Sequence, residues 1–561
     1  MSGAGHRPPA AAGSVRAWSA SAAVVDAVVI GAGPNGLVAA NRLADAGWSV
    51  TVLEAAEEPG GAVRSGELTL PGFRHDLFSA FYPLAMASPA LRRLHLEEHG
   101  LRWCHAPLVV AHALADGRAA AISTDLDQTA ASLEGFARGD GDAWRTLSRQ
   151  WQSVGEPFLD LVFRPFPPLR PAARLAARLG PRELLRFARH LLLPVRRMGE
   201  ELFAGEGARL LLAGNALHSD VSPESAGSGL YGWLLCCLAQ QHGFPLPRGG
   251  AAELTGALVR RLGARGGTVR CGCAVVEVVV RRGRAVGART AAGEVVEARR
   301  AVLADVAAPA LYGELVSAEH LPAGLLHDVE RFQWDMGTVK VDWALDGPIP
   351  WTAEAARQAG TVHVADDVDE LTEHAAHLAM RRLPARPFLV VGQPSLGDPT
   401  RSPPGTDTAW AYTHIPRRVH ADAAGALPVG GGEAAWLAGF VARLEARIEL
   451  RAPGFGRLVR ARHVASPASL QAADANLVGG AVNGGTAQLH QQLLLRPVPG
   501  AGRAETPVAG LYLASASAHP GGGVHGAAGA NAARAALLPA HRPRHWILGK
   551  IQGAVRPPRL G

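Results

Sequence analysis

The opening part of the chain has the hydrophobic pattern of a strand–helix–strand unit. Residues 24–30 form a short apolar run rich in β-branched residues, which is typical of a buried parallel strand. After a glycine-rich turn, residues 35–46 have the length and spacing of a helix, and residues 49–53 resemble a second buried strand. This succession indicates an α/β fold built on a parallel sheet.

Helix and strand patterns continue to alternate farther along the chain. Residues 131–245 are mainly helical, and Pro171, Pro181 and Pro194 are expected to cut them into short helices. The other segments with a clear pattern are helices over 88–100, 433–450 and 526–536 and strands over 269–280, 284–289, 295–302, 332–345, 388–391 and 511–513. We therefore expect a second region of mixed sheet and helix beside the parallel sheet.

The turn after the first strand carries the spacing G-x-G-x-x-G. Gly31 permits the tight turn, Gly33 lets a pyrophosphate approach the backbone, and Gly36 lets the helix pack on its strand. The helix that begins here points its free N–H groups and positive dipole end at the phosphates. The alternative is a glycine-rich loop of another α/β domain, but strand, turn, helix and strand all fall in register here. A Rossmann-like dinucleotide site is the prediction.

An acidic residue ends this unit. Glu54 follows the second strand, where its carboxylate can accept hydrogen bonds from an adenosine ribose. Because a carboxylate there disfavours a 2′-phosphate, the unit predicts FAD or NAD rather than NADP.

Two further glycine turns are candidates for ligand contact. The first contains Gly60 and Gly61 and is followed by Arg64. The second, residues 519–523, ends in three glycines and leads into a helix of small residues. Backbone N–H donors at such a turn can meet an electron-rich group of a ligand. A plain helix cap is the alternative, although a cap does not need three adjacent glycines.

Composition and charge narrow the classes of function. The 561 residues carry a formal net charge of +7, with 48% hydrophobic and 19% charged residues, as in an ordinary globular protein. Arginine supplies nearly all of the positive charge, because Lys340 and Lys550 are the only lysines. No nucleic-acid-binding motif is present, so we expect no nucleic-acid partner.

The cysteines indicate no disulfide framework and no metal site. There are five, sparsely placed and without a C-x-x-C pair, which argues against dithiol chemistry. Cys271 and Cys273 would share one face of a strand, where ordinary packing is a simpler interpretation than a metal pair. Cys236 and Cys237 lie in an apolar segment and are interpreted as core.

The terminal and basic segments bear on location. Residues 1–23 are rich in Ala, Gly, Ser and Pro and lack an apolar core, so we interpret them as a flexible tail and not as an export signal. No transmembrane helix is predicted, and the expected location is the cytoplasm. Residues 170–197 are basic and rich in leucine. They are interpreted as a solvated face of a cap domain, with a membrane-surface patch as the alternative.

Several motifs together resemble those of the phytoene desaturase and amine oxidase group of flavoproteins. The segments GAGPNGLVAANRLADAGWSVTVLEA and PGGAV resemble its FAD-binding start. Residues 247–250, the strand 269–280, Arg496-Pro497 and LYLASASAHPGGGVHG resemble its later elements in the same order. Pro34-Asn35 and Ala62 depart from the carotenoid desaturase pattern. The GGAV, PGF and HPGGGVHG segments look closer to the pyridine nucleotide-disulphide oxidoreductase domain-containing protein 2 branch.

The resemblance implies FAD as the cofactor and a glutathione-reductase-type FAD-binding domain assembled from discontinuous segments. This domain would comprise residues 24–85, 245–310 and 500–540, and a substrate or cap domain would comprise 86–244 and 311–499, followed by a tail at 541–561. The cofactor-binding residues expected from the fingerprint and the resemblance are Gly31, Gly33, Pro34, Asn35, Gly36, Glu54, Gly60, Gly61, Arg64, Val275, Pro520, Gly521, Gly522, Gly523 and Val524.

The resemblance also implies an FAD-dependent oxidoreductase that takes hydride from an apolar organic substrate, such as a polyene or a lipid-like molecule. Electrons would then pass to oxygen, a quinone or another external acceptor. Amine oxidation and a non-catalytic flavin-binding interaction protein are the alternatives. No general base can be named. His519 and His525 flank the flavin motif, and a structural role is the simpler interpretation of each.

Overall fold

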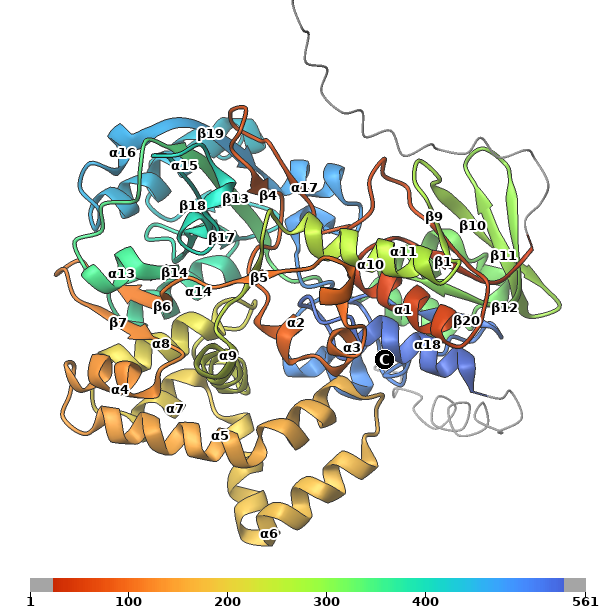
Figure 1. Ribbon diagram of the computed structural model, residues 1–561, viewed down its shortest axis with the longest axis horizontal. Coiled ribbons are helices and arrows are strands. Elements are labelled where there is room, and N and C mark those ends of the chain that lie inside the picture. The colour runs from red at the N-terminus through yellow and green to blue at the C-terminus, as the bar shows by residue number, and fades with distance from the viewer. Residues whose placement is uncertain (1–23, 539–561) are drawn as a thin grey trace, which may run out of the picture.

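The computed structural model describes residues 24–538, and Figure 1 shows their arrangement. The predicted tails, 1–23 and 541–561, lie outside these residues. The first of two large sheets holds seven strands in the order β10-β11-β12-β1-β2-β9, with β20 pairing β12. Its strands are β1 (Val25–Ile30), β2 (Val50–Leu53), β9 (Thr268–Arg270), β10 (Val275–Arg281), β11 (Arg284–Thr290), β12 (Val295–Ala304) and β20 (Leu511–Leu513).

The centre of the first sheet is parallel, as the apolar strand pattern predicts. β1 lies between β2 and β12 and runs parallel to both, and β20 runs parallel to β12. These strands come from three separate stretches of the chain, which confirms a dinucleotide sheet assembled from discontinuous segments. The antiparallel strands β10 and β11 extend the sheet at one edge.

Three helices pack together beside this sheet, and small residues allow two of them to cross closely. α1 (Pro34–Asp45) contacts both α18 (Ala527–Leu537) and α10 (Ala252–Ala264). At the crossing of α1 and α18, a Cβ placed on Gly529 would lie 1.8 Å from the carbonyl oxygen of Asn35. The run of small residues before the C-terminus is therefore a condition for the two helices to touch.

The second sheet also has seven strands, in the order β19-β13-β17-β16-β14-β6-β7. Helix α15 (Glu433–Glu449) covers one face through Trp436, Phe440 and Leu444. Helices α8 (Glu206–Ala216) and α9 (Ser228–His242) belong to the hydrophobic core on the other side (Figure 1). The strands are β6 (Leu108–Ala113), β7 (Ala119–Ile122), β13 (Gly337–Leu345), β14 (Ala359–Val364), β16 (Leu389–Gly392), β17 (Asp407–Ile415) and β19 (Val459–Ala465).

A helical layer completes the molecule, and two of its helices project from the body (Figure 1). The layer contains α4 (Leu126–Glu134), α5 (Asp140–Phe163), α6 (Leu169–Leu192) and α7 (Val195–Leu202). α6 is broken at Gly180, whose φ of 72° is not helical, directly before Pro181. Pro171 lies in the first turn of α6, whereas Pro181 follows the break and Pro194 separates α6 from α7, so two of the three prolines divide helices as predicted.

Short elements connect these layers. The helices are α2 (Pro83–Ala87), α3 (Pro89–Arg92), α11 (Ala308–Ala310), α12 (Ala323–Glu330), α13 (Glu354–Gln358), α14 (Val368–Ala379), α16 (Phe455–Leu458) and α17 (Pro467–Ala473). The strand pairs are β3 (Ser65–Gly66) with β4 (His75–Asp76), β5 (Trp103–Cys104) with β8 (Leu246–Pro247), and β15 (Arg382–Leu383) with β18 (Ala421–Asp422). Among residues 24–538, no helix combines the length and the apolar character needed to cross a bilayer.

Two sequence predictions were wrong in detail. The strand expected over 269–280 is two strands, because Gly272 takes a φ of 64° and turns the chain between β9 and β10. Cys271 and Cys273 therefore lie in this turn and not on one face of a strand. The helix expected over 88–100 is the short α3 followed by one 3-10 turn, with His95 in a left-handed conformation between them. Cys236 and Cys237 are buried in the core, as expected.

Candidate functional site

A cavity of about 1200 Å³ joins the two large sheets. At one end it is lined by Gly31, Gly33 and Glu54, beside the carboxyl ends of β1 and β2. At the other end it is lined by Thr338 of β13 and Trp410 of β17. We call these regions the cofactor end and the chamber.

The glycine fingerprint forms the floor of the cofactor end. A Cβ placed on Gly36 would lie 2.2 Å from the carbonyl oxygen of Gly31, so the turn closes only with glycine. A Cβ on Gly33 would lie 2.7 Å from Oδ2 of Asp305. The same Asp305 oxygen accepts the backbone N–H of Gly36 at 2.7 Å. The start of α1 is therefore packed against a carboxylate from another strand.

Three acids lie around this turn: Glu54, Asp305 and Asp474. Only Glu54 was predicted from the sequence. Glu54 accepts the backbone N–H groups of Ala32 at 2.7 Å and Ala56 at 2.9 Å, which fixes its carboxylate at the end of β2. Asp305 directly follows β12, and burial raises its pKa to about 8, helped by the nearby charges of Asp474 and Glu54. Its position after a predicted apolar strand was the signal that could have identified it.

The second glycine turn packs on the first. A Cβ placed on Gly61 would lie 3.2 Å from Cα of Gly33. Gly60 has a φ of 129°, a conformation that favours glycine. Arg64 ties the turn to a distant segment, because its guanidinium donates to the carbonyl oxygens of Gly61 at 2.9 Å and Ala473 at 2.7 Å.

The C-terminal glycine turn is held on three sides. A Cβ on Gly522 would lie 2.7 Å from the carbonyl oxygen of Asn483, and one on Gly523 would lie 2.6 Å from Cδ1 of Leu84. Gly521 has a φ of 113° and lies against Arg496. The turn therefore packs against Asn483 and Leu84 more closely than residues with side chains could.

The cavity brings most of the predicted cofactor residues together. Twelve of the fifteen line it directly, and Gly36, Gly60 and Gly521 lie behind the lining. Val275 is the first residue of β10, at the edge of the first sheet. The twelve are Gly31, Gly33, Pro34, Asn35, Glu54, Gly61, Arg64, Val275, Pro520, Gly522, Gly523 and Val524.

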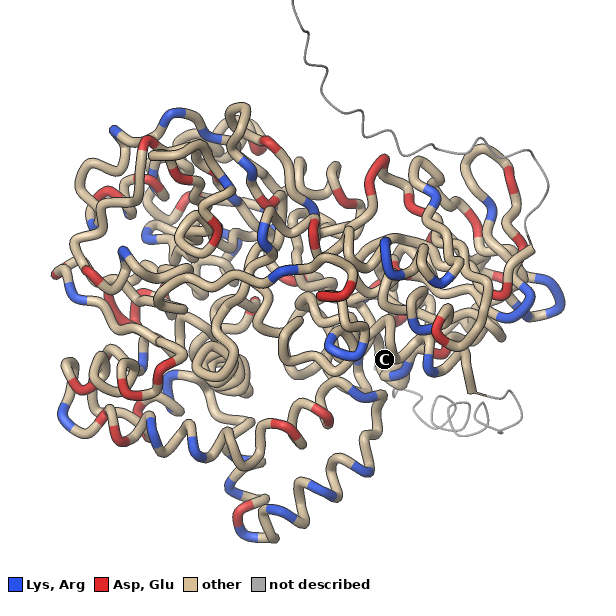
Figure 2. Tube along the Cα trace, in the orientation of Figure 1, with Lys and Arg blue, Asp and Glu red and all other residues tan. Residues whose placement is uncertain are grey.

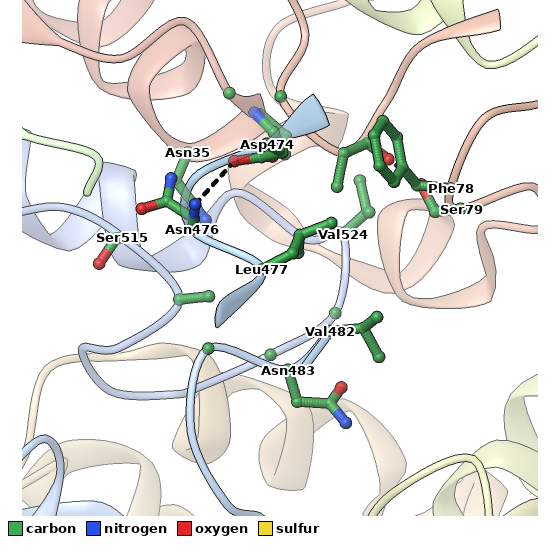
Figure 3. A pocket seen from close by; sticks show the side chains of 18 of the residues that line it. Asn35, Phe78, Ser79, Asp474, Asn476, Leu477, Val482, Asn483, Ser515 and Val524 are labelled. Carbon is green, nitrogen blue, oxygen red and sulfur yellow. Dashed lines mark hydrogen bonds between the residues drawn. The ribbon is translucent and has the colours of Figure 1, made fainter. Parts of the chain in front are cut away.

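The cavity walls contain polar atoms that lack protein partners. Within residues 24–538, Oδ1 of Asn35 and Nδ2 of Asn483 are buried without a hydrogen bond. Figure 3 shows both side chains at the cavity, with Asp474 and Asn476 beside Asn35. Because buried polar groups are normally hydrogen-bonded, such atoms fit a site that a polar ligand completes.

The chamber is lined by large apolar and aromatic side chains. Trp410 and Tyr412 stack with ring centroids 6.1 Å apart, and Phe81 packs on Trp410 at 5.9 Å. Leu234 of α9 and Phe163 of α5 close the other walls. This lining excludes water and favours an apolar ligand.

Lys340 is a chamber residue that the sequence analysis did not identify. It lies on the fully buried β13, and its Nζ donates to the carboxylate of Asp342 at 2.5 Å and to the carbonyl oxygen of Asp76 at 2.9 Å. Arg401 binds the carboxylate of Asp76 at 3.1 Å. The signal was its rarity, because arginine replaces lysine nearly everywhere else in the chain.

Buried histidines extend from the chamber into the second sheet. Nε2 of His218, which lines the cavity, lies 2.8 Å from Nε2 of His363. Burial lowers the pKa of His218 to about 3 and that of His414 to about 4, so both rings are neutral near pH 7. The neutral His218 ring thus pairs with His363, whereas both ring nitrogens of the buried His414 lack a hydrogen-bond partner within residues 24–538.

The two histidines that flank the flavin motif are also buried. His519 makes a hydrogen bond of 3.0 Å to the carbonyl oxygen of Arg164, and His525 accepts the backbone N–H of Ala527 at 3.0 Å. Burial lowers the pKa of each to about 4. Their contacts join the C-terminal turn to neighbouring backbone, which favours a structural role for each ring.

Comparisons with known proteins agree with this geometry. The family model described as flavin containing amine oxidoreductase matches residues 35–406. The chain belongs to this flavoprotein family.

Full-length relatives support the same assignment. The chain is 29% identical to mouse pyridine nucleotide-disulfide oxidoreductase domain-containing protein 2, covering 91% of this chain and 92% of the relative. It is 25% identical to a neurosporene-forming phytoene desaturase of Cereibacter sphaeroides, covering 91% and 94%. Among solved structures, wild-type putrescine oxidase bound to putrescine shares the fold with a TM-score of 0.57 at 17% identity, covering 91% and 98%.

This flavoprotein is an FAD-dependent oxidoreductase. The flavin supplies hydride acceptance when it is bound. The residues present fit such a cofactor, because Glu54 lines the cavity at the carboxyl end of β2 and α1 begins beside it, where a helix N-terminus can bind phosphate. The glycine turns at residues 60–61 and 521–523 provide close backbone walls.

Proposed function

We propose that this flavoprotein oxidises an apolar, lipid-like or polyene substrate by hydride loss. The observation that supports the proposal most is the chamber, where Trp410, Tyr412, Phe163 and Leu234 provide an apolar lining next to the C-terminal flavin turn. Such a lining positions a substrate carbon while excluding water. Oxygen or a quinone then receives the electrons from the cofactor.

Charge in the chamber disfavours an amine substrate. The cavity-lining residues of the second sheet include Lys340 and no carboxylate. The cavity carboxylates Glu54, Asp305, Glu314 and Asp474 all come from segments outside the second sheet. A protonated amine in the chamber would face the Lys340 ammonium group. No carboxylate from the second sheet lines the cavity to pair with that amine.

Anaerobic reduction tests this proposal. Purified FAD-loaded protein is mixed with polyenes, unsaturated lipids and amines, and loss of the oxidised flavin absorbance is followed. We expect bleaching by an apolar compound, with a product two hydrogens lighter. Bleaching by amines alone would contradict the proposal and favour amine oxidation. A flavin that dithionite reduces but no organic compound reduces would favour a non-catalytic flavin-binding protein. Adding oxygen or a quinone to the reduced protein then identifies the acceptor.

We further propose that α6 contacts an anionic lipid surface. Leu169, Leu185 and Leu192 are 72%, 73% and 57% exposed on this projecting helix. Arginines follow its length, as Figure 2 shows. Exposed leucines together with basic charge are typical of helices that lie at a membrane interface. Helix α5, which packs on α6, reaches the cavity through Phe163, so such contact would place lipid near the chamber.

A further inference from the structure

A fully buried arginine lies behind the C-terminal flavin turn. The guanidinium of Arg496 donates to four backbone carbonyl groups, those of Asn483 at 3.0 Å, Gly484 at 3.2 Å, Thr486 at 2.9 Å and Ala516 at 2.8 Å. Arg496 as a whole is 1% exposed. Across residues 24–538, no carboxylate oxygen comes within the 4.0 Å limit of an ion pair with it. Carbonyl dipoles therefore solvate this cation without cancelling its charge.

The nearest acids are engaged elsewhere. Asp335 accepts the backbone N–H groups of Val482 and Asn483, both at 2.8 Å, and Asp220 accepts that of Ala487 at 2.7 Å. The loop 482–487 thus gives its N–H groups to two carboxylates and its carbonyl groups to the guanidinium. Both acids lower the net charge of the cluster, but neither touches the arginine.

The cation is in direct contact with the glycine turn. A Cβ placed on Gly521 would lie 3.2 Å from Cζ and 3.3 Å from Nε of Arg496. Gly522 packs on Asn483, which Arg496 holds. Arg496 itself lines the cavity. The turn that faces the flavin therefore has a fixed positive charge directly behind it.

A buried unpaired charge is costly, and its field is weakly screened because water is excluded. Hydride acceptance adds negative charge to a flavin, and a nearby fixed cation stabilises that form. We propose that Arg496 raises the reduction potential of the bound FAD through its charge. The inference rests on the FAD assignment and adds to the proposed function a residue that makes the cofactor a stronger hydride acceptor.

Sulfite provides a test that does not depend on the natural substrate. Sulfite adds to oxidised flavin, leaves negative charge on the ring and bleaches its absorbance, so its affinity reports positive charge at the site. The experiment compares wild type, Arg496→Met and Arg496→Lys for sulfite affinity and for the flavin reduction potential. Arg503→Met is the control. Arg503 pairs with Glu505 at 3.0 Å, and neither residue lines the cavity.

We expect Arg496→Met to weaken sulfite binding about ten- to hundredfold and to lower the potential, as loss of an interaction with a charged group implies. Arg496→Lys, which keeps the charge, should stay close to wild type, and Arg503→Met should match it. Equal losses in the Met and Lys variants would overturn the proposal, because the role would then be structural. Wild-type values in Arg496→Met would also overturn it.

A second variant keeps the test decisive if Arg496→Met retains no FAD. Asp335→Asn removes a negative charge beside Arg496 while keeping an acceptor oxygen for the loop. We expect it to raise the potential and tighten sulfite binding, and unchanged values would reject the proposal. Substrate bleaching is measured separately, so failure of the substrate proposal and failure of the Arg496 proposal give different results.

Discussion

The cofactor end of the cavity is walled by backbone, whereas the chamber is walled by large side chains. At the cofactor end, the turn at Gly61 packs on Gly33, and the turn at Gly522 packs on the backbone of Asn483. In the chamber, Trp410 and Lys340 project from strands of the second sheet. Backbone walls at the cofactor end restrict the shape of the ligand that can bind there. The chamber combines its apolar lining with Lys340, whose ammonium group pairs with Asp342.

The largest expected effect is at the cofactor end. Gly33→Val places a side chain where a Cβ alone would lie 2.7 Å from Asp305. We expect FAD to be lost, because a side chain there would occupy the space that lets a pyrophosphate approach the backbone. The measurement is the ratio of flavin to protein absorbance after purification. Gly263→Ala is the matched control, since no atom lies within 4 Å of a Cβ there. Full FAD occupancy in Gly33→Val would contradict the assignment.

The next effect is a loss of stability in the chamber, with the residues of the cofactor end unchanged. Lys340→Met leaves the carboxylate of Asp342 buried without its partner, and such a loss costs about 3–5 kcal/mol of unfolding free energy. The double variant Lys340→Met with Asp342→Leu should recover part of that loss, because both charges are then gone. Denaturant unfolding of the singles and the double measures this coupling. Additive losses would show that the two side chains do not stabilise each other.

The C-terminal turn joins the two ends and should show a smaller effect. Gly522→Ala pushes a methyl group against the carbonyl of Asn483, which displaces the turn from the flavin. Losing donors to the reduced flavin costs about 1–3 kcal/mol. We therefore expect a lower flavin reduction potential and slower reduction of the flavin by substrate, with FAD retained. Spectroelectrochemistry measures the potential. An unchanged potential and rate would mean that the turn is only a helix cap.

A pH effect separates the acids of the cofactor end from the neutral histidines of the chamber. The pKa of Asp305 is raised to about 8 in the folded protein, so its protonated form stabilises the fold. That contribution is complete below about pH 4, the ordinary value, and is lost as pH rises through about 8. We expect Asp305→Asn to flatten the fall in apo-protein stability between these values. Thermal melts from pH 4 to 9 test this, and identical profiles for both proteins would refute it.

The smallest effect concerns α6, which lies outside both ends. Each arginine near an anionic surface contributes about 1 kcal/mol, and salt screens this attraction. Flotation with vesicles of phosphatidylcholine and phosphatidylserine should show binding at low salt that fades at high salt. Leu185→Ser should weaken it, whereas Leu450→Ser, at a leucine 60% exposed elsewhere, should not. Absence of binding at either salt concentration would reject the membrane proposal.

Local sequence patterns predicted the cofactor end because its residues act within short segments. Gly31, Gly33 and Gly36 form one turn, and Glu54 ends the adjacent strand. Lys340 and Arg496 escaped prediction as site residues because their partners, Asp76 and Asn483 among them, are brought together only by the fold. Likewise β9 and β10 look like one strand in sequence, and only the left-handed Gly272 reveals the break.

The most direct test of the central claim compares wild type with Leu234→Trp. The measurement is the rate at which an apolar compound reduces the bound FAD in the absence of oxygen. Leu234 lines the chamber from α9, a segment separate from the glycine turns of the cofactor end, so the larger ring should fill substrate space only. We predict full FAD occupancy, normal reduction by dithionite and loss of reduction by the apolar compound. Undiminished reduction by that compound in Leu234→Trp would contradict the claim that the chamber is the substrate site.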